Sequence, residues 1–516
     1  MYYRYIIAIT LGVFCGTLIA FTVNFSSEIF LVSLFLFLMN LIVFKFKNKS
    51  YTQNERGFSL ALSIFFFAVS FGIILGQVSL YKDLVKAQKF SEFISNKNNL
   101  TGIVYKVKHK SNSQELFLNV NSETKNNFNI KIVTNNIPEY NIGETISVTG
   151  YISTSIVILP SITTNNNSIN TENLNKLSDI SGEMAFPKIS ILEGSKNSVF
   201  DEYLSKIKNS KGQFTKRLEK SSSVHGAALG SGTLIGDASL FSKDETSNFR
   251  LSGLSHIIVV SGFNVTIIIL VLIYLFSFLN IELKFRISIL ILSILLFMGF
   301  IGFESSIVRA GFMAIALLLS YLSGRGHAAR QTLFLVSLSM IILNPRISAY
   351  DISFHLSFLA TFGILFVFPI LRSLLKINLD KNNFFQKIFH SLYEIFLVTL
   401  AIEIVTIPYL GFTFGYISVL GIFANILVLP TLAIIMLLGF LTFVFSFSFF
   451  ISSIFGFILS IFSDYIFWIA KIFSEFSFSK LIINFSFLFL VIYYLCLILF
   501  LIFETKRKEI KKYLDK

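Results

Sequence analysis

The feature that most limits how this chain can fold is the repeated occurrence of uninterrupted apolar stretches along most of its length. Each stretch is about 17 to 25 residues long, which matches the length of α-helix needed to cross a bilayer. The composition agrees, because 54% of the 516 residues are hydrophobic and only 14% are charged, against roughly a quarter in soluble domains. The sequence therefore predicts a polytopic α-helical membrane protein.

The apolar stretches form two groups that are separated by a polar region. Three early spans are predicted at about 5–23, 29–44 and 58–80. A polar region of about 170 residues follows, up to Arg250. Nine further spans bring the count to about twelve. They lie at about 257–279, 287–303, 305–322, 331–343, 350–370, 391–411, 416–445, 448–471 and 481–503.

These stretches predict four parts of the chain, which are 1–80, 81–225, 226–504 and 505–516. The first is a group of transmembrane spans, the second is extracytoplasmic, the third is a transmembrane bundle, and the last is a basic cytoplasmic tail. The first apolar stretch resembles a signal peptide, but no small-residue cleavage site follows it, so we expect a retained span. Segment 331–343 is too short for a full crossing, which leaves a re-entrant or protein-buried helix.

Lysine and arginine in short loops predict the orientation, because such loops remain on the cytoplasmic side. With an even number of spans, all of the basic loops and the tail fall on one side of the membrane. This arrangement places 81–250 outside and the C-terminus in the cytoplasm. It also explains the net charge of +14 more simply than a polyanion-binding surface does. The loop residues are Lys45, Lys47, Lys49, Arg56, Arg325, Arg330, Arg372, Lys376, Lys381 and Lys387.

The extracytoplasmic region contains short segments in which apolar and polar residues alternate, from "LTGIVYKVKHK" to "GETISVTGYIS". This spacing predicts an inserted small β-barrel, OB-like, at about 95–165, with a sandwich as the alternative. Its aromatic and basic residues fit a surface for single-stranded nucleic acid or, more simply, a small core with lysines on the solvent side. They are Tyr105, Phe117, Phe128, Tyr151, Lys106, Lys108, Lys110 and Lys131. The basic amphipathic segment 205–220 could lie on the membrane surface.

The sequence contains no recognisable motif for an enzyme. The glycine-rich "GSGTLIGD" lacks the lysine of a phosphate-binding loop. The six histidines are scattered, and both cysteines lie in apolar segments, so we expect no metal site and no cofactor. His256 and Ser261 are five residues apart and diverge on a regular helix, which argues against a serine hydrolase.

Polar residues within predicted spans are costly, so each is expected to face a partner or a cavity. Glu304 and Arg309 lie near the tip of a helical hairpin. They could form an ion pair with each other, or Arg309 could act on a substrate. Asp351 and His355 are four residues apart, which places them on one helix face, where a structural hydrogen bond is the default.

Two further segments combine a polar residue with a helix breaker five residues later. They are Glu403 with Pro408, and Asn425 with Pro430. Helices that break at membrane depth are tolerated where they line a cavity or are buried in protein. Their occurrence together in one bundle predicts a polar pathway.

Four blocks, in this order, resemble the ComEC competence family of bacterial DNA-uptake channels. The blocks are "ALGSGTLIGD…LSGLSHIIVVSGFNV", "SSIVRAGFMA…LSGRGHAAR", "LNPRISAYDISFHLSFLAT" and "TIPYLGFTFGYISVLGIFANILVLP". The matching residues are Gly236, Asp237, Gly253, His256, Ser261, Gly262, Arg309, Ala310, Met313, Arg325, Asn344, Pro345, Asp351, Phe354, Leu356, Ser357, Ala360, Pro408, Phe414, Ser418, Asn425 and Pro430. Asn264 departs from the pattern, because many members have a second histidine there.

The resemblance implies a channel for single-stranded DNA in the inner (cytoplasmic) membrane during natural transformation. It implies an extracytoplasmic DNA receptor and a cytoplasmic helicase as partners, and leaves a homo-oligomer open. Longer members carry a metallo-β-lactamase-like domain that this chain lacks, so strand degradation is expected from another protein. The residues expected in the DNA pathway or its motifs are Asp237, His256, Ser261, Gly262, Asn264, Arg309, Arg325, Asp351, His355, Glu403, Pro408, Asn425 and Pro430. The alternatives are a transporter or exporter of another polar or lipid-linked substrate, and a scaffold without a pore.

Overall fold

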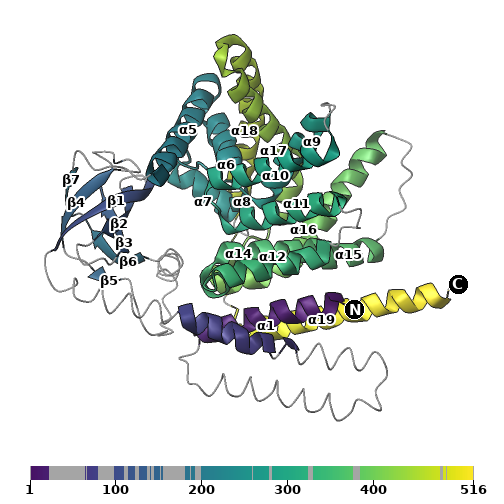
Figure 1. The fold of residues 1–516 in the computed structure, drawn as a ribbon. Coiled ribbons are helices and arrows are strands. Elements are labelled where there is room, and N and C mark those ends of the chain that lie inside the picture. The colour runs from purple at the N-terminus through teal and green to yellow at the C-terminus, as the bar shows by residue number, and fades with distance from the viewer. Residues whose placement is uncertain are drawn as a thin grey trace. The chain divides into compact units, whose positions relative to one another are not determined.

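The computed structural model describes most of the helical chain and the strands of the polar region. The described residues are 2–22, 64–65, 67–79, 98–109, 114–121, 127–135, 140, 144–150, 153–154, 180–185, 187–191, 199–258, 260–277, 282–322, 329–375, 384–476, 480–483 and 485–514. The predicted span at 29–44, the basic loop at 45–56 and the motif residue Arg325 lie outside them. The chain divides into two compact units, and Figure 1 labels their helices and strands. Unit 1 is Met1–Ser210 with Arg330–Phe354, and unit 2 is Lys211–Ala329 with His355–Lys516.

The strands of unit 1 form one seven-stranded sheet in the order β5-β6-β3-β2-β1-β4-β7. Strands β1, β2 and β3 form an antiparallel meander, β6 is parallel to β3, and β4 pairs with β1 and β7. The strands are β1 (Asn98–His109), β2 (Gln114–Asn121), β3 (Asn127–Thr134), β4 (Thr145–Gly150), β5 (Ser153–Thr154), β6 (Ile180–Ala185) and β7 (Lys188–Ile191). The predicted boundary at 165 is therefore wrong, because two strands beyond it complete the sheet. The strand "ISGEMA" does not alternate, and "KISI" alternates over only four residues, which is too short a pattern to stand out.

Alternate residues of β2 and β3 form the core of this sheet, as period-two patterning requires. Leu116 and Leu118 pack there with Ile130 and Ile132. The opposite face is also covered. Phe117 is 5% exposed and Lys131 is 7% exposed, and Lys131 forms an ion pair with Glu115 at 3.3 Å. Phe117 is therefore buried, but on the face opposite the main core, and Lys131 is neither on the solvent side nor on an open nucleic-acid surface.

The helices of unit 1 pack closely through small residues. Helix α1 (Tyr2–Thr22) lies against the helix Phe67–Ser79, and a Cβ added at Gly16 would overlap the carbonyl oxygen of Val69. Such small-residue contacts let membrane helices approach at the backbone. The described part of this unit also includes α12 (Ala329–Leu343) and α13 (Ile347–Tyr350). Helix α12 has 15 residues, as expected for the short segment 331–343.

Seven described helices are long and apolar enough to cross a membrane, so the protein is a multi-pass membrane protein. The helical ranges are Leu283–Ile301, Ser305–Leu322, Ile352–Leu374, Gln386–Phe414, Gly421–Phe447, Phe449–Glu475 and Phe487–Arg507. Four shorter apolar helices occur at Ile6–Ala20, Phe67–Ser79, Asn264–Tyr274 and Ala329–Leu343. The count of twelve spans stays a prediction. The boundary near 445 agrees, because α17 (Gly421–Val444) ends there and α18 (Phe449–Glu475) begins after a short 3-10 turn.

Unit 2 also contains helices that are too short or too polar to be counted as spans. They are α6 (Val224–Ile235), α7 (Lys243–Leu251), α8 (Ser255–Ile258) and α9 (Gly262–Ser277). The longer helices are α10 (Leu283–Ile301), α11 (Ser305–Leu322), α16 (Phe384–Phe414), α17, α18 and α19 (Phe487–Leu514). Helix α14 (Ile352–Phe362) continues through a π-helical turn at Gly363–Val367 into α15 (Phe368–Leu374).

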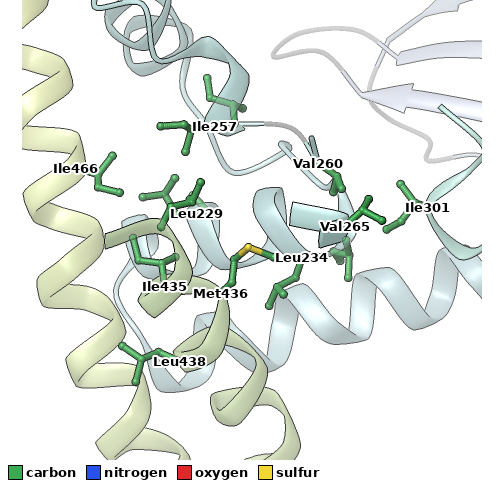
Figure 2. Packing of buried hydrophobic residues seen from close by; sticks show 14 of the residues in the cluster. Leu229, Leu234, Ile257, Val260, Val265, Ile301, Ile435, Met436, Leu438 and Ile466 are labelled. Atoms are coloured by element: carbon green, nitrogen blue, oxygen red, sulfur yellow. The ribbon is translucent and has the colours of Figure 1, made fainter. Parts of the chain in front are cut away.

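Helix α6 lies in the centre of the main core of unit 2, and Gly226–Ile235 are all buried. Figure 2 shows Leu229 of α6 close to Ile435 of α17 and Ile466 of α18, with Ile257 of α8 nearby. The glycines of α6 permit this central position, because a Cβ at Gly232 would lie 2.5 Å from the carbonyl oxygen of Ile258.

The basic segment before α6 packs against protein through its apolar side. Helix α5 (Val199–Ser221) places Phe214 and Leu218 in the same core, and the Phe214 ring centroid is 4.4 Å from that of Phe443. These two side chains are therefore not available to a lipid surface. The prediction that segment 205–220 lies on the membrane surface is therefore wrong for its second half, whose apolar side chains are buried in protein.

The expected helix breaks at the two prolines do not occur. Helix α16 continues through Pro408, although proline has no N–H to donate to the carbonyl of Ile404, four residues earlier. The hydroxyl of Tyr493 on α19 donates to that carbonyl oxygen at 2.7 Å. Tyr494 donates to the next one, on Val405, at 2.8 Å. The released backbone groups are thus satisfied by a neighbouring helix, as a membrane interior requires.

Helix α17 also continues through Pro430, where the Tyr465 hydroxyl donates at 3.4 Å to the carbonyl oxygen of Leu427, three residues before the proline. The irregular backbone occurs elsewhere. One break separates α8 from α9 near Val260 and Ser261, and another separates α13 from α14 at Asp351. The polar segments that interrupt helices are therefore those of the first and third family-like blocks.

Candidate site at the break between α8 and α9

The break between α8 and α9 places three motif residues around one backbone irregularity. Asn264 is completely buried, and its side-chain amide donates to the carbonyl oxygen of Thr233 at 3.0 Å. Ser261 donates to the amide oxygen of Asn264 at 3.2 Å. These bonds tie the start of α9 to α6, so Asn264 holds the break in place instead of facing a passing substrate. His256, on the other side of the break, is exposed.

Asp237 fixes the end of α6 against α5. Gly236 ends the helix in the left-handed conformation at φ 72°, and the Asp237 carboxylate accepts a hydrogen bond from the Thr215 hydroxyl at 2.7 Å. Lys211, one turn before Thr215, donates to the carbonyl oxygen of Ile301 at 3.1 Å. Burial lowers the pKa of Lys211 from its ordinary value, although the negative charges of Glu304 and Asp237 act in the opposite direction.

Arg309 of α11 is the most unusual polar group of this region. The side chain is 9% exposed. Its Nε donates to the Ser357 hydroxyl of α14 at 2.7 Å, and its Nη1 is 3.6 Å from the sulfur of Met313. Within the described chain these are its hydrogen-bond partners, and both are uncharged. Of the two alternatives for Arg309, the ion pair with Glu304 is therefore not formed, and within the described chain the buried guanidinium has no carboxylate partner.

The remaining guanidinium nitrogen of Arg309 lies beside the start of α9. A Cβ added at Gly262 would be only 2.7 Å from Nη2, so glycine at this position leaves room for the cation. A buried cation is costly unless an anion compensates it. This corner between α9, α11 and α14 can therefore hold an anionic group.

A second polar group of residues gathers where the turn after α7 meets the start of α17. Gly253 adopts φ 77°, and a Cβ there would lie 2.8 Å from the Cα of Gly421. Ser418 fastens this contact by donating to the carbonyl oxygen of Leu251 at 2.8 Å. A Cβ at Gly421 would be 3.4 Å from the carboxylate of Glu403, which places that carboxylate at the same junction.

Asp351 and His355 of the third block have different roles. Asp351 precedes α14 and accepts a hydrogen bond from the backbone N–H of Phe354 at 3.1 Å, which is the geometry of a helix N-cap. His355 lies on the helix itself, and its Nδ1 is 2.6 Å from the hydroxyl of Tyr409 on α16. The expectation that both lie on one helix face does not hold for Asp351, because it caps the helix.

The polar group around His225 in unit 2 was not identified from sequence patterns. His225 of α6 lies between two carboxylates, with Nδ1 2.6 Å from Asp464 of α18 and Nε2 3.1 Å from Glu245 of α7. Its ring stacks on Phe467 with centroids 4.0 Å apart. The signal that could have revealed it is Asp464, a carboxylate in the middle of a long and mainly apolar helix. Because the two carboxylates bond opposite ring nitrogens, this group clamps three helices together and does not converge on one ion.

No curated protein and no solved structure matches the chain. The family model described as competence protein matches residues 233–508, which is more than half of the chain. The match contains the α8–α9 break, Arg309, the cap of α14 and the α16–α17 pair. The chain belongs to the competence protein family.

Proposed function

We propose that the protein carries single-stranded DNA across the cytoplasmic membrane during natural transformation, and that it has no enzymatic step of its own. Family membership suggests a role in DNA uptake. The observation that carries the finer proposal is the buried Arg309, whose hydrogen bonds go to Ser357 and Met313. A single strand presents one phosphate charge per nucleotide, and an arginine fork matches phosphate geometry well.

A strand that moves inward also needs a driving force. Carrying negative charge against an inside-negative potential costs about 2.3 kcal/mol per charge per 100 mV. The sequence has no ATPase motif. We therefore propose a cytoplasmic helicase as the motor and an extracytoplasmic receptor as the source of the strand.

The sheet of unit 1 supports an OB-like barrel as part of this proposal. Strand β4 pairs with β1, and β5, which follows it closely, pairs with β6. Strand β6 is parallel to β3, so the pairing can return around the sheet to its start, as in a small Greek-key barrel. DNA contact is not assigned to Phe117 or Lys131, because both are buried.

The function is tested by following DNA labelled on one strand in host cells that lack the gene. Label should still bind at the cell surface but should not reach a protected cytoplasmic state, and restoring the gene should restore entry. Normal entry in the deleted strain would refute the proposal. An exporter of another substrate would leave DNA entry unchanged, so the same measurement separates the two functions.

We also predict the topology of the chain. A single cysteine at Ser122 should react with a membrane-impermeant thiol reagent in intact cells, whereas one at Lys508 should react only after the membrane is opened. The native Cys15 and Cys496 must first be replaced. The physical reason is the gathering of lysine and arginine in loops expected on the cytoplasmic side. The reverse labelling pattern would overturn the orientation.

A further inference from the structure

Helices α16 and α17 are joined by a short connection and pack against each other as an antiparallel pair, so the positions that face one another can be read from helix periodicity. The carboxylate of Glu403 lies opposite Gly421, where an added Cβ would be 3.4 Å from it. In an antiparallel pair, one turn back on the first helix faces one turn forward on the second. Thr399 shares a face with Glu403 and Asn425 shares a face with Gly421, so helix periodicity places Thr399 and Asn425 at one level, one turn from the carboxylate.

All three side chains have oxygens that lack partners. Thr399 is 4% exposed and Asn425 is 9% exposed, and the Oγ1 of the first and the Oδ1 of the second are buried without a hydrogen bond. Glu403 is half-buried, and among the described residues its carboxylate has neither a hydrogen bond nor an ion pair. Such groups are costly to leave unsatisfied in a membrane interior.

Other buried threonines of the same helices behave differently. Thr406 donates to the carbonyl oxygen of Ile402 at 3.0 Å, and Thr442 donates to that of Leu438 at 2.7 Å. This bond to the backbone four residues earlier is the usual way to satisfy a helical threonine. Thr399 leaves its hydroxyl oxygen without such a bond.

We infer that Glu403, Thr399 and Asn425 form a site for a small monovalent cation within the α16–α17 pair. The ligands would be a carboxylate, a hydroxyl and an amide oxygen, which are the donors that hard cations prefer. A single carboxylate balances a single positive charge, whereas a divalent ion would leave a net charge in a medium of low dielectric constant. The ion is either Na⁺ or a proton carried on Glu403.

The site goes beyond the proposed function and is defined without reference to DNA. A bound cation would also reduce the electrostatic repulsion between Glu403 and the phosphates of a passing strand. An ionised carboxylate near a path for phosphates would repel them strongly at low dielectric constant. A cation on Glu403 would cancel this repulsion.

The test uses the purified full-length protein and a hydrophobic carbodiimide, which modifies protonated carboxyl groups in apolar surroundings. Mass spectrometry should find the modification on Glu403 in choline chloride, and E403Q should lose it. Protection by NaCl at constant pH and ionic strength identifies the ion as Na⁺. Modification that NaCl leaves unchanged but that falls as the pH rises identifies it as a proton. Glu403 that stays unmodified in choline chloride at every pH, while the protein is folded, would overturn the site.

Matched variants test the two neighbours. If Na⁺ protects, N425L and T399V should need at least about tenfold more Na⁺ for the same protection, since each removes one oxygen ligand. If a proton occupies the site, both should shift the pH at which modification is half complete. The control is T406V, which lies on the same helix and removes a hydroxyl already bonded to the backbone. Equal behaviour of all three variants would refute the assignment of Thr399 and Asn425.

Discussion

Replacing Arg309 by alanine should abolish transformation while leaving the amount of protein in the membrane near normal. Buried charged contacts across an interface are worth about 2 to 5 kcal/mol, so uptake should fall by at least about 30-fold. The protein itself should tolerate the change, because Arg309 bonds only to the uncharged Ser357 and Met313 in the described chain. No buried carboxylate is left behind there, and the cost of burying a cation is removed.

Two companion variants distinguish a phosphate contact from a structural role. Arg309→Lys should keep part of the activity, because it retains the charge but loses the planar fork. Glu304→Ala combined with Arg309→Ala should stay inactive, since the two residues are not paired. Lys284→Ala, an exposed cation on α10, is the matched control and should transform normally. Full transformation by the Arg309→Ala strain with normal expression would remove this arginine from the mechanism.

The spans were predictable because their apolar length is a local property of the sequence. The stretch 305–322 coincides with α11, and the boundary near 445 coincides with the end of α17. The continuity of α16 through Pro408 was not predictable, because it depends on Tyr493, which is distant in the sequence and donates to the released carbonyl. A proline is a local signal, whereas its rescue comes from tertiary contact.

The candidate site shows the same division between local and distant information. The family-like blocks identified Arg309 and Asn264 as polar residues that require partners. They could not decide whether Arg309 pairs with Glu304, five residues away, or with Ser357 on another helix. The N-cap role of Asp351 was within reach of sequence, because an aspartate before an apolar helix is typical of that position. The hydrogen bonds of His225 could not be predicted from sequence, because its two carboxylate partners come from different helices, α7 and α18.

Replacing Gly456 by alanine should strongly destabilise unit 2, although alanine is normally the better helix residue. Gly456 of α18 faces the end of α5, where an added Cβ would overlap the carbonyl oxygen of Ser221 and lie 2.6 Å from its carbon. These are backbone atoms, so they cannot rotate away. Hydrogen bonds on both sides hold this contact, from Ser452 to Ser221 and from the Ser223 N–H to Ser460, each at 2.8 Å.

The expected cost of the Gly456→Ala change is about 3 kcal/mol, the upper range for overpacking a close contact. The measurement is the midpoint of thermal unfolding in detergent, together with the amount of protein in the membrane. Gly212→Ala is the matched control, because Gly212 is in α5 and a Cβ there would meet no atom within 4 Å. This control should gain up to about 1 kcal/mol from helix propensity. If both variants unfold at the same temperature, α5 and α18 are not in the close contact that fixes α6 in the centre of the core.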